Sequence, residues 1–345
     1  ENTEIHDTDW LIVLDADEFV SIKVGRGWIR DLIAHVPSQT DAIALTWRFF
    51  GSSGHQDWNP GLVTSSYTNA APDNFKRGWG VKTLFRPFED MKLGIHRPHM
   101  RHAKSIPSRA QAMLAQNWVN GSGQPMPEDF ALAGWRSTKP TLGYDHAEIN
   151  HYGVKSLEAY LLRQARGNVN NKADKYNDAY FALFDRNEIP APNIQRHGRA
   201  TRRMLARLLE DPVLDDLQQQ AIAWHRARMD EIRSSDTYAE QVEALQRAGA
   251  IPFADLDQVL FTQHLPKIWQ SRIASMRKAG VADKDLALMI ARSQTARKGE
   301  IRTALRATAA SQAPEQAKGP RDPVEAAAPG GSSAETGPTD QDANP

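Results

Sequence analysis

The sequence contains no cysteine among its 345 residues. This absence excludes disulfides, zinc–thiolate sites and thiol nucleophiles, and it suits a reducing compartment. No apolar run reaches the length of a membrane-spanning helix, and no signal peptide is recognisable. An excess of one charge is also missing, because Lys and Arg number 42 and Asp and Glu number 42. No overall charge therefore favours nucleic acid as a partner.

The most informative stretch is residues 10–19, in which five apolar residues lead directly into Asp15, Asp17 and Glu18. A short apolar run of this kind is typical of a strand buried on both faces. In open α/β sheets, ligands bind beyond the carboxyl ends of the strands. Residues two apart on an extended chain face the same side, so we expect both Asp carboxylates to face one divalent cation. The alternative is an acidic strand–loop junction without a ligand.

Further elements follow from periodicity and from turn residues. We expect an amphipathic helix at residues 27–35, a strand with one buried face at 43–49 and another strand at 81–86. Residues 50–55 are predicted to form a turn of small residues. Residues 103–145 give little periodic signal and are predicted to be a long loop, either a flap over an acceptor or an insertion.

A second helix is predicted after Ser156, which is a suitable N-cap. Its apolar side carries Leu157, Tyr160 and Leu161, and it closes at residues 166–167. Basic residues at 155, 163 and 166 fall in one sector of this helix if it starts early enough to include residue 155. They are candidates for binding phosphate oxygens, and the alternative is a solvated basic face.

From about residue 196 the pattern changes to helices without strands. Residues 196–209 are basic on one side and apolar on the other, which is typical of a helix on an anionic membrane surface or of one whose apolar side packs on its own domain. Further helices are predicted after Asp236, ending at Gly249, and around residues 286–290. Beyond residue 311 no aromatic residue occurs, and we expect a disordered tail.

The motifs of the first half occur together in a recognisable order. They are residues 10–19, Trp47-Arg-Phe-Phe-Gly-Ser-Ser-Gly-His55, Pro60-Gly-Leu-Val63, Lys82-Thr-Leu-Phe-Arg-Pro87, Gly94-Ile-His-Arg-Pro98, Asn150-His-Tyr152, Lys155-Ser156 and Arg166-Gly167. This combination resembles the bacterial glycosyltransferase family-2-like proteins related to the family 92 glycosyltransferases. The resemblance covers roughly the first half of the chain and implies a GT-A-like, Rossmann-like α/β fold with a mixed sheet.

The resemblance implies a transferase that moves a sugar from a nucleotide-sugar donor to a glycan or lipid-linked acceptor in bacterial surface polysaccharide assembly. On this interpretation Mn²⁺ or Mg²⁺ is the cofactor, and its expected ligands are Asp15, Asp17 and His151. The donor diphosphate is then expected to contact Lys155, Arg163 and Arg166, with Trp47 and His55 on the sugar or acceptor side. A metal ion and fixed cations stabilise the charge that develops on a leaving diphosphate.

An inverting transfer also requires a general base within hydrogen-bond reach of the acceptor hydroxyl. The candidates in this sequence are Glu18, His96 and Asp129. The sequence does not choose among them, and it does not decide between inversion and retention.

The domain organisation follows from the same motifs. We expect a catalytic domain at residues 1–190, an α-helical extension at 191–310 and a disordered tail at 311–345. In a GT-A fold a nucleotide-binding half precedes the Asp-x-Asp strand, whereas only nine residues precede Trp10 here. We therefore expect a catalytic domain that lacks this half and shows weak or no turnover by itself. The expected location is the cytoplasm, with peripheral contact at the inner membrane face through the basic helix 196–209.

Two other classes compete with this interpretation. A metal-dependent phosphohydrolase also uses Asp-x-Asp after a strand, but it commonly has Thr or Val where this chain has Phe19. The third possibility is a non-catalytic, truncated domain whose helical region and tail serve in assembly.

Overall fold

The computed structural model describes residues 7–100, 111–167, 176–256, 276 and 278–280. The chain divides into two compact units, Glu1–Ser275 and Met276–Pro345. The first unit contains the predicted catalytic domain together with most of the described helices after residue 190. The predicted helix at residues 286–290 and the predicted tail lie outside the described residues.

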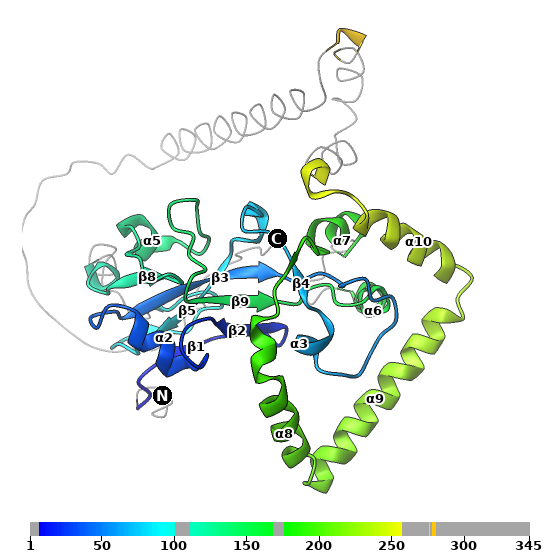
Figure 1. Cartoon of the computed structure of the whole chain (residues 1–345), viewed down its shortest axis with the longest axis horizontal. Coiled ribbons are helices and arrows are strands. Elements are labelled where there is room, and N and C mark those ends of the chain that lie inside the picture. Colours follow the sequence, from blue (N-terminus) through cyan, green and yellow to red (C-terminus); the bar gives the residue numbers. More distant parts are fainter. Residues whose placement is uncertain (1–6, 101–110, 168–175, 257–275, 277, 281–345) are drawn as a thin grey trace, which may run out of the picture. The chain divides into compact units, whose positions relative to one another are not determined.

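The first unit has a mixed α/β fold built around a six-stranded mixed sheet (Figure 1). The strand order is β1-β5-β3-β9-β2, and β8 also pairs with β3. β3 runs parallel to β8 and β9 but antiparallel to β5. The strands are β1 (Leu11–Ile12), β2 (Glu18–Ile22), β3 (Ala42–Phe49), β5 (Val81–Phe85), β8 (Trp118–Asn120) and β9 (Ala147–His151).

Helices and short strands make up the rest of the described part of the first unit. The helical elements are α2 (Ile29–His35), α3 (Val63–Ser66), η1 (Lys76–Gly78), α5 (Glu128–Ala133), α6 (Leu157–Arg166), α7 (Asp178–Phe184), η2 (Asn193–His197), α8 (Gly198–Leu208), α9 (Pro212–Arg233), α10 (Tyr238–Gly249) and η3 (Phe253–Asp255). The short strands are β4 (Asn69–Ala70), β6 (Met91–Lys92), β7 (His99–Met100) and β10 (Ile189–Pro190). The predicted helix at 27–35 and the predicted strand at 81–86 are thus confirmed as α2 and β5.

β3 is the centre of the hydrophobic core. All eight of its residues are buried, so the prediction of one buried face was too narrow. Ile43 and Leu45 pack into the main cluster, whereas Ala42 and Ala44 pack into a second cluster with Phe130 of α5. The polar Arg48 is buried on this second face because Glu148 of β9 accepts a hydrogen bond from its Nε at 2.8 Å.

Two sequence predictions for the first half were wrong. The stretch before Asp15 forms a two-residue strand, β1, at the edge of the sheet rather than a strand buried on both faces. It pairs with β5 alone, and Leu14 beyond it is 36% exposed. Residues 103–145 were predicted to be a loop, but they include β8 and α5. These elements are too short for periodicity to reveal them.

α6 matches its prediction closely. The Oγ of Ser156 accepts a hydrogen bond from the backbone N–H of Ala159 at 3.2 Å, so Ser156 is the N-cap. Tyr160 and Leu161 are buried on the apolar side. The helix ends before Gly167, whose positive φ of 75° is a conformation that favours glycine.

The helices after residue 190 differ in how they pack. α10 packs on α6 and α7, and its Val242 and Leu245 are buried. One interpretation of the sequence was that the apolar side of α8 packs on its own domain. The structure does not show this for Met204 and Leu208, which are 55% and 49% exposed. Among the described residues no helix is both long and apolar enough to cross a membrane.

Candidate functional site

The Asp-x-Asp-Glu motif forms a tight turn between β1 and β2. The backbone N–H of Glu18 donates to the carbonyl of Asp15 at 3.1 Å, and the Oε2 of Glu18 accepts from the backbone N–H of Asp15 at 2.9 Å. Because the chain turns here instead of staying extended, the two Asp carboxylates have different partners. The sequence analysis assumed that the chain is extended at Asp15 and Asp17, and that assumption was wrong.

Asp15 and Glu18 share a buried lysine. The Nζ of Lys82 lies 3.1 Å from the Oδ2 of Asp15 and 3.1 Å from the Oε2 of Glu18. Its third partner is the carbonyl of Ile95, at 2.9 Å. Lys82 is fully buried on β5, so this ammonium group neutralises the acidic turn from inside the fold.

Asp17 faces His151 instead. In the antiparallel pairing of β2 with β9, Glu18 is aligned with His151, and the N–H of Tyr152 donates to the carbonyl of Asp17 at 2.9 Å. This register places the Oδ2 of Asp17 3.7 Å from the Nε2 of His151 and 3.9 Å from the Nη1 of Arg163. The sequence prediction that His151 lies beside the Asp-x-Asp motif is thus in agreement with the geometry.

The three basic residues predicted to bind phosphate line one cavity of about 600 Å³ together with Asp17. Lys155 precedes the N-cap of α6, and Arg163 and Arg166 lie in its last turns. Arg163 is held in place, because its Nη1 donates to the carbonyl of Gly153 and its Nη2 donates to the Tyr176 hydroxyl. The site therefore combines one carboxylate with three cationic side chains.

The charges in this cavity are coupled. Burial opposes ionisation of Asp17, but the interaction with the neighbouring His151 and the charges of Arg163 and Lys155 lower its pKa to about 2. Asp17 is therefore ionised at neutral pH. Burial lowers the pKa of the Lys155 ammonium group, although Asp17 opposes this effect. Lys155 also adopts a positive φ of 61°, a strained conformation that is often found at functional sites.

His151 rests on an aromatic platform. Its ring centroid lies 5.0 Å from that of Trp47 and 4.5 Å from that of Phe49. Trp47 in turn contacts His96 at 5.3 Å, and His96 stacks on Trp135 at 5.0 Å. Trp47 is only 6% exposed, so it supports the histidines from beneath and presents little surface to a sugar.

The remaining predicted residues lie in different surroundings. His55 is exposed, and its Nε2 lies 3.0 Å from the carbonyl of Ser66. Asp129 is exposed in the first turn of α5, where its Oδ1 accepts from the N–H of Phe130. The side chain of Glu18 is fully enclosed, and burial raises its pKa. Of these, Glu18 alone is in the acidic turn.

The side chains around Asp17 include few ligands for a divalent ion. No group of three or more His, Asp or Glu side chains in the described ranges is arranged to hold a metal. Asp17 and His151 are adjacent, whereas one oxygen of Asp15 is bound to Lys82. Two protein ligands suffice for Mg²⁺ or Mn²⁺ when substrate phosphates complete the coordination shell. Asp17 and His151 therefore fit such an ion as a pair.

Sequence reasoning missed two contributions to the site. Lys82 was placed in a strand, but nothing in its local sequence indicated that it would reach the acidic turn. Trp58, Trp224 and His225 also line the cavity. The last two come from α9, outside the half of the chain that carries the motifs.

Comparison with known proteins gives no further guidance: no family model, curated protein or solved structure matches this chain.

Proposed function

We propose that this protein is a metal-dependent glycosyltransferase that transfers a sugar from a nucleoside diphosphate donor to an acceptor hydroxyl. The observation that carries the proposal is the meeting of Asp17 with Lys155, Arg163 and Arg166 at one cavity, with His151 beside Asp17. The order of motifs that resembles the glycosyltransferases supports the same conclusion. A bacterial surface glycan or its lipid-linked precursor is the proposed acceptor.

The chemistry required of such a site is stabilisation of the leaving diphosphate. Its negative charge increases as the glycosidic bond breaks, and fixed cations lower the energy of that state without reorganising. Arg163 is suited to this role because its guanidinium is already held by Gly153 and Tyr176. Lys155 and the exposed Arg166 supply further donors from the two ends of α6.

Asp17 and His151 would hold the divalent ion. Bound there, the ion would neutralise diphosphate oxygens, as Mg²⁺ and Mn²⁺ commonly do. The ionised state of Asp17 at neutral pH supports this assignment. Asp15 is proposed as a further ligand, through water or through the oxygen that does not contact Lys82.

Among the predicted general bases, His96 is the best candidate. Burial and the charge of Lys82 lower its pKa, which keeps the ring neutral at pH 7. Its Nδ1 lies 3.1 Å from the carbonyl of Val81, and a carbonyl can only accept, so Nδ1 carries the proton and Nε2 keeps its lone pair. Glu18 is enclosed, and Asp129 lies in the first turn of α5, where its Oδ1 accepts from the N–H of the adjacent Phe130.

We also propose a cytoplasmic location with contact at the inner membrane face through α8. The exposed Met204 and Leu208 on this helix, together with its exposed arginines, support the proposal.

Thermal unfolding of the full chain tests the proposed function. Nucleoside diphosphates are expected to raise the Tm, and to raise it further when Mn²⁺ is present, because a ligand that binds only the folded state stabilises it. The absence of any shift with a panel of nucleoside diphosphates, with or without Mn²⁺, would contradict the proposal.

A further inference from the structure

Glu158 accepts hydrogen bonds from three other segments of the chain. Its side chain is fully buried on α6, and its Oε2 accepts a hydrogen bond from the backbone N–H of Trp58 at 2.7 Å. The guanidinium of Arg233, at the end of α9, donates to both oxygens at 2.7 and 2.9 Å. The hydroxyl of Tyr238, at the start of α10, donates at 2.9 Å.

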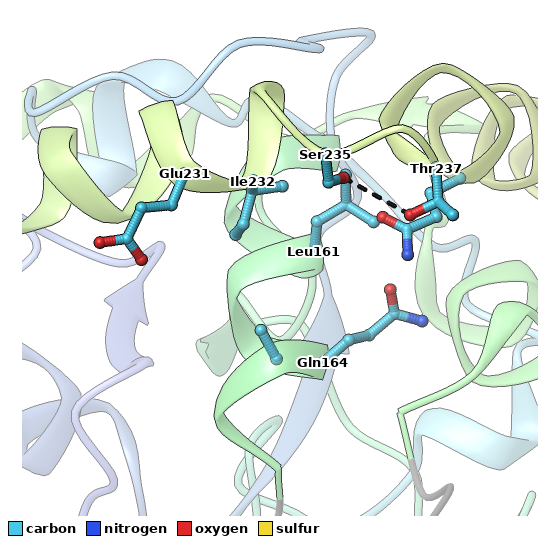
Figure 2. A pocket seen from close by; sticks show the side chains of 8 residues that line it. Leu161, Gln164, Glu231, Ile232, Ser235 and Thr237 are labelled. Atoms are coloured by element: carbon cyan, nitrogen blue, oxygen red, sulfur yellow. Dashed lines mark hydrogen bonds between the residues drawn. The ribbon is translucent and has the colours of Figure 1, made fainter.

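The end of α9 also contacts α6, and Ile232 packs against the main hydrophobic cluster, which includes Leu161. Figure 2 shows that Ile232 and Ser235 line a pocket together with Leu161 and Gln164 of α6. The hydroxyls of Ser235 and Thr237 lie 3.4 Å apart where the chain passes from α9 to α10. α9 is therefore anchored at its C-terminal end, next to the helix that carries the basic residues.

This anchoring places aromatic rings of α9 at the cavity. The ring of His225 stacks on that of Trp58, with centroids 4.2 Å apart and an interplanar angle of 15°. Trp224 lies beside them, with centroids of Trp224 and His225 6.3 Å apart, and it is 56% exposed. All three side chains line the same cavity as Lys155 and Arg166. One wall is thus aromatic, while the α6 side is cationic.

We propose that this aromatic wall, and Trp224 in particular, binds the planar base of the nucleoside diphosphate whose phosphates lie against α6. The guanidinium of Arg228 lies 5.7 Å from the centroid of the Trp224 ring, and the rest of the indole is well exposed. An exposed indole face stacks on any nucleobase, whereas an inorganic anion gains less from it. The arrangement makes Trp224 a specificity-determining residue supplied by the helical extension. This inference rests on the proposed function, because it assigns a ligand to the same cavity.

Calorimetric titration of the full chain with UDP and with inorganic pyrophosphate, both with Mn²⁺, tests the inference. The wild-type protein is expected to bind UDP about 10-fold to 100-fold more tightly than pyrophosphate, which is the contribution expected of base stacking. Trp224→Ala is expected to lose most of this preference while pyrophosphate affinity changes less than about twofold, within the error of additivity. Trp28→Ala is the matched control, since Trp28 is 47% exposed at the start of α2 and is absent from the lining of this cavity.

The outcomes separate the two proposals. Equal affinity of the wild-type chain for UDP and pyrophosphate would overturn the stacking role and leave the diphosphate site standing. If Trp224→Ala lowered the affinities for UDP and for pyrophosphate by the same factor, the stacking role would also be overturned. Trp224 would then affect only the shape of the cationic site. Failure of both ligands to bind would refute the proposed function and this inference with it.

Discussion

The Nε2 of His151 lies 3.7 Å from the Oδ2 of Asp17, although 134 positions separate the two residues in sequence (151 − 17 = 134). The pairing of β2 with β9 creates this proximity, because Glu18 is aligned with His151 across the two strands. The cavity next to Asp17 is lined by the basic residues of α6. One sheet register therefore brings His151 beside the acidic turn, next to the cavity lined by the basic residues.

Removing a cation from the cavity is expected to weaken phosphate binding. Lys155→Asn removes the ammonium group and suits the positive φ at this position, since Asn tolerates left-handed backbone. Arg166→Gln removes the guanidinium. Each change is expected to lower the affinity for a nucleoside diphosphate about 10-fold or more, which is the usual contribution of a hydrogen bond to a charged group.

Isothermal titration calorimetry measures this effect, and circular dichroism confirms folding. Arg199→Gln is the matched control, because Arg199 is an exposed arginine on α8 that does not line the cavity. Equal affinities for the wild-type protein and both α6 variants would contradict a phosphate role for these residues.

The buried Lys82 is expected to be essential for stability. Lys82→Met leaves the enclosed Glu18 without its ammonium partner, and removing one member of a buried ion pair typically costs about 3–5 kcal/mol. The double variant Lys82→Met with Glu18→Gln is expected to lose less than the sum of the two single changes, because the enclosed carboxylate is then removed together with its partner. The remaining carboxylate, Asp15, is 56% exposed and can be solvated by water. Urea denaturation measures these free energies of unfolding.

Lys92→Met, at an exposed position of β6, is the control and is expected to change the free energy of unfolding little. If Lys82→Met changed the free energy of unfolding as little as this control, the ion pair would not stabilise the acidic turn.

Glu158 gives a pH-dependent prediction. Burial opposes its ionisation, but the bonds from Arg233, Trp58 and Tyr238 lower its pKa below the ordinary 4.5. A lowered pKa in the folded state adds stability above the unfolded pKa, and this contribution is lost as the pH falls through the folded value. Glu158→Gln is therefore expected to lower the Tm at pH 7, with a difference that narrows below about pH 4.5.

Differential scanning calorimetry of both proteins between pH 3 and pH 7 measures this difference. Glu243→Gln is the control, because Glu243 is exposed on α10 and forms an ion pair with Arg247, one turn later on the same helix. A Tm difference that stays constant across this range would show that the charge of Glu158 is not what joins α6, α9 and the segment at Trp58.

The sequence predicted the local features well and the distant contacts poorly. The Ser156 cap, the buried side of α6 and the strand β5 depend on patterns within a few residues, and periodicity captures them. The turn at Asp15 depends on Lys82, which is 67 residues away, and no local pattern reports that contact. The aromatic wall from α9 depends on Glu158 in the same way, through bonds that cross 75 residues to Arg233.

The predicted positions of the basic residues and of the two Asp residues were not equally accurate. Arg163 and Arg166 both lie in the last turns of α6, so their common location followed from helical spacing. Lys155 lines the same cavity from outside the helix, because it precedes the N-cap and has a positive φ. The two Asp residues were assumed to lie on an extended chain. The side chain of Glu18 instead closes a turn by accepting from the N–H of Asp15, and the carboxylates separate.

The exposed apolar side of α8 predicts membrane contact. The full chain is expected to sediment with vesicles that contain anionic lipid, and Met204→Gln with Leu208→Gln is expected to reduce the bound fraction, because these side chains are half exposed. Leu132→Gln, exposed on α5, is the control. Binding that is equal for neutral and anionic vesicles, or unchanged in the α8 variant, would exclude this surface.

The most direct test of the central claim is the affinity of a nucleoside diphosphate, measured by calorimetry with and without Mn²⁺, for the wild-type chain and for Asp17→Asn. The account predicts that Mn²⁺ strengthens binding to the wild-type protein and that Asp17→Asn removes this gain while the protein stays folded. An exposed control, Asp145→Asn, is expected to retain the full Mn²⁺ effect. If Mn²⁺ strengthened binding equally in the wild-type and Asp17→Asn proteins, Asp17 would not hold the ion and the proposed catalytic centre would be wrong.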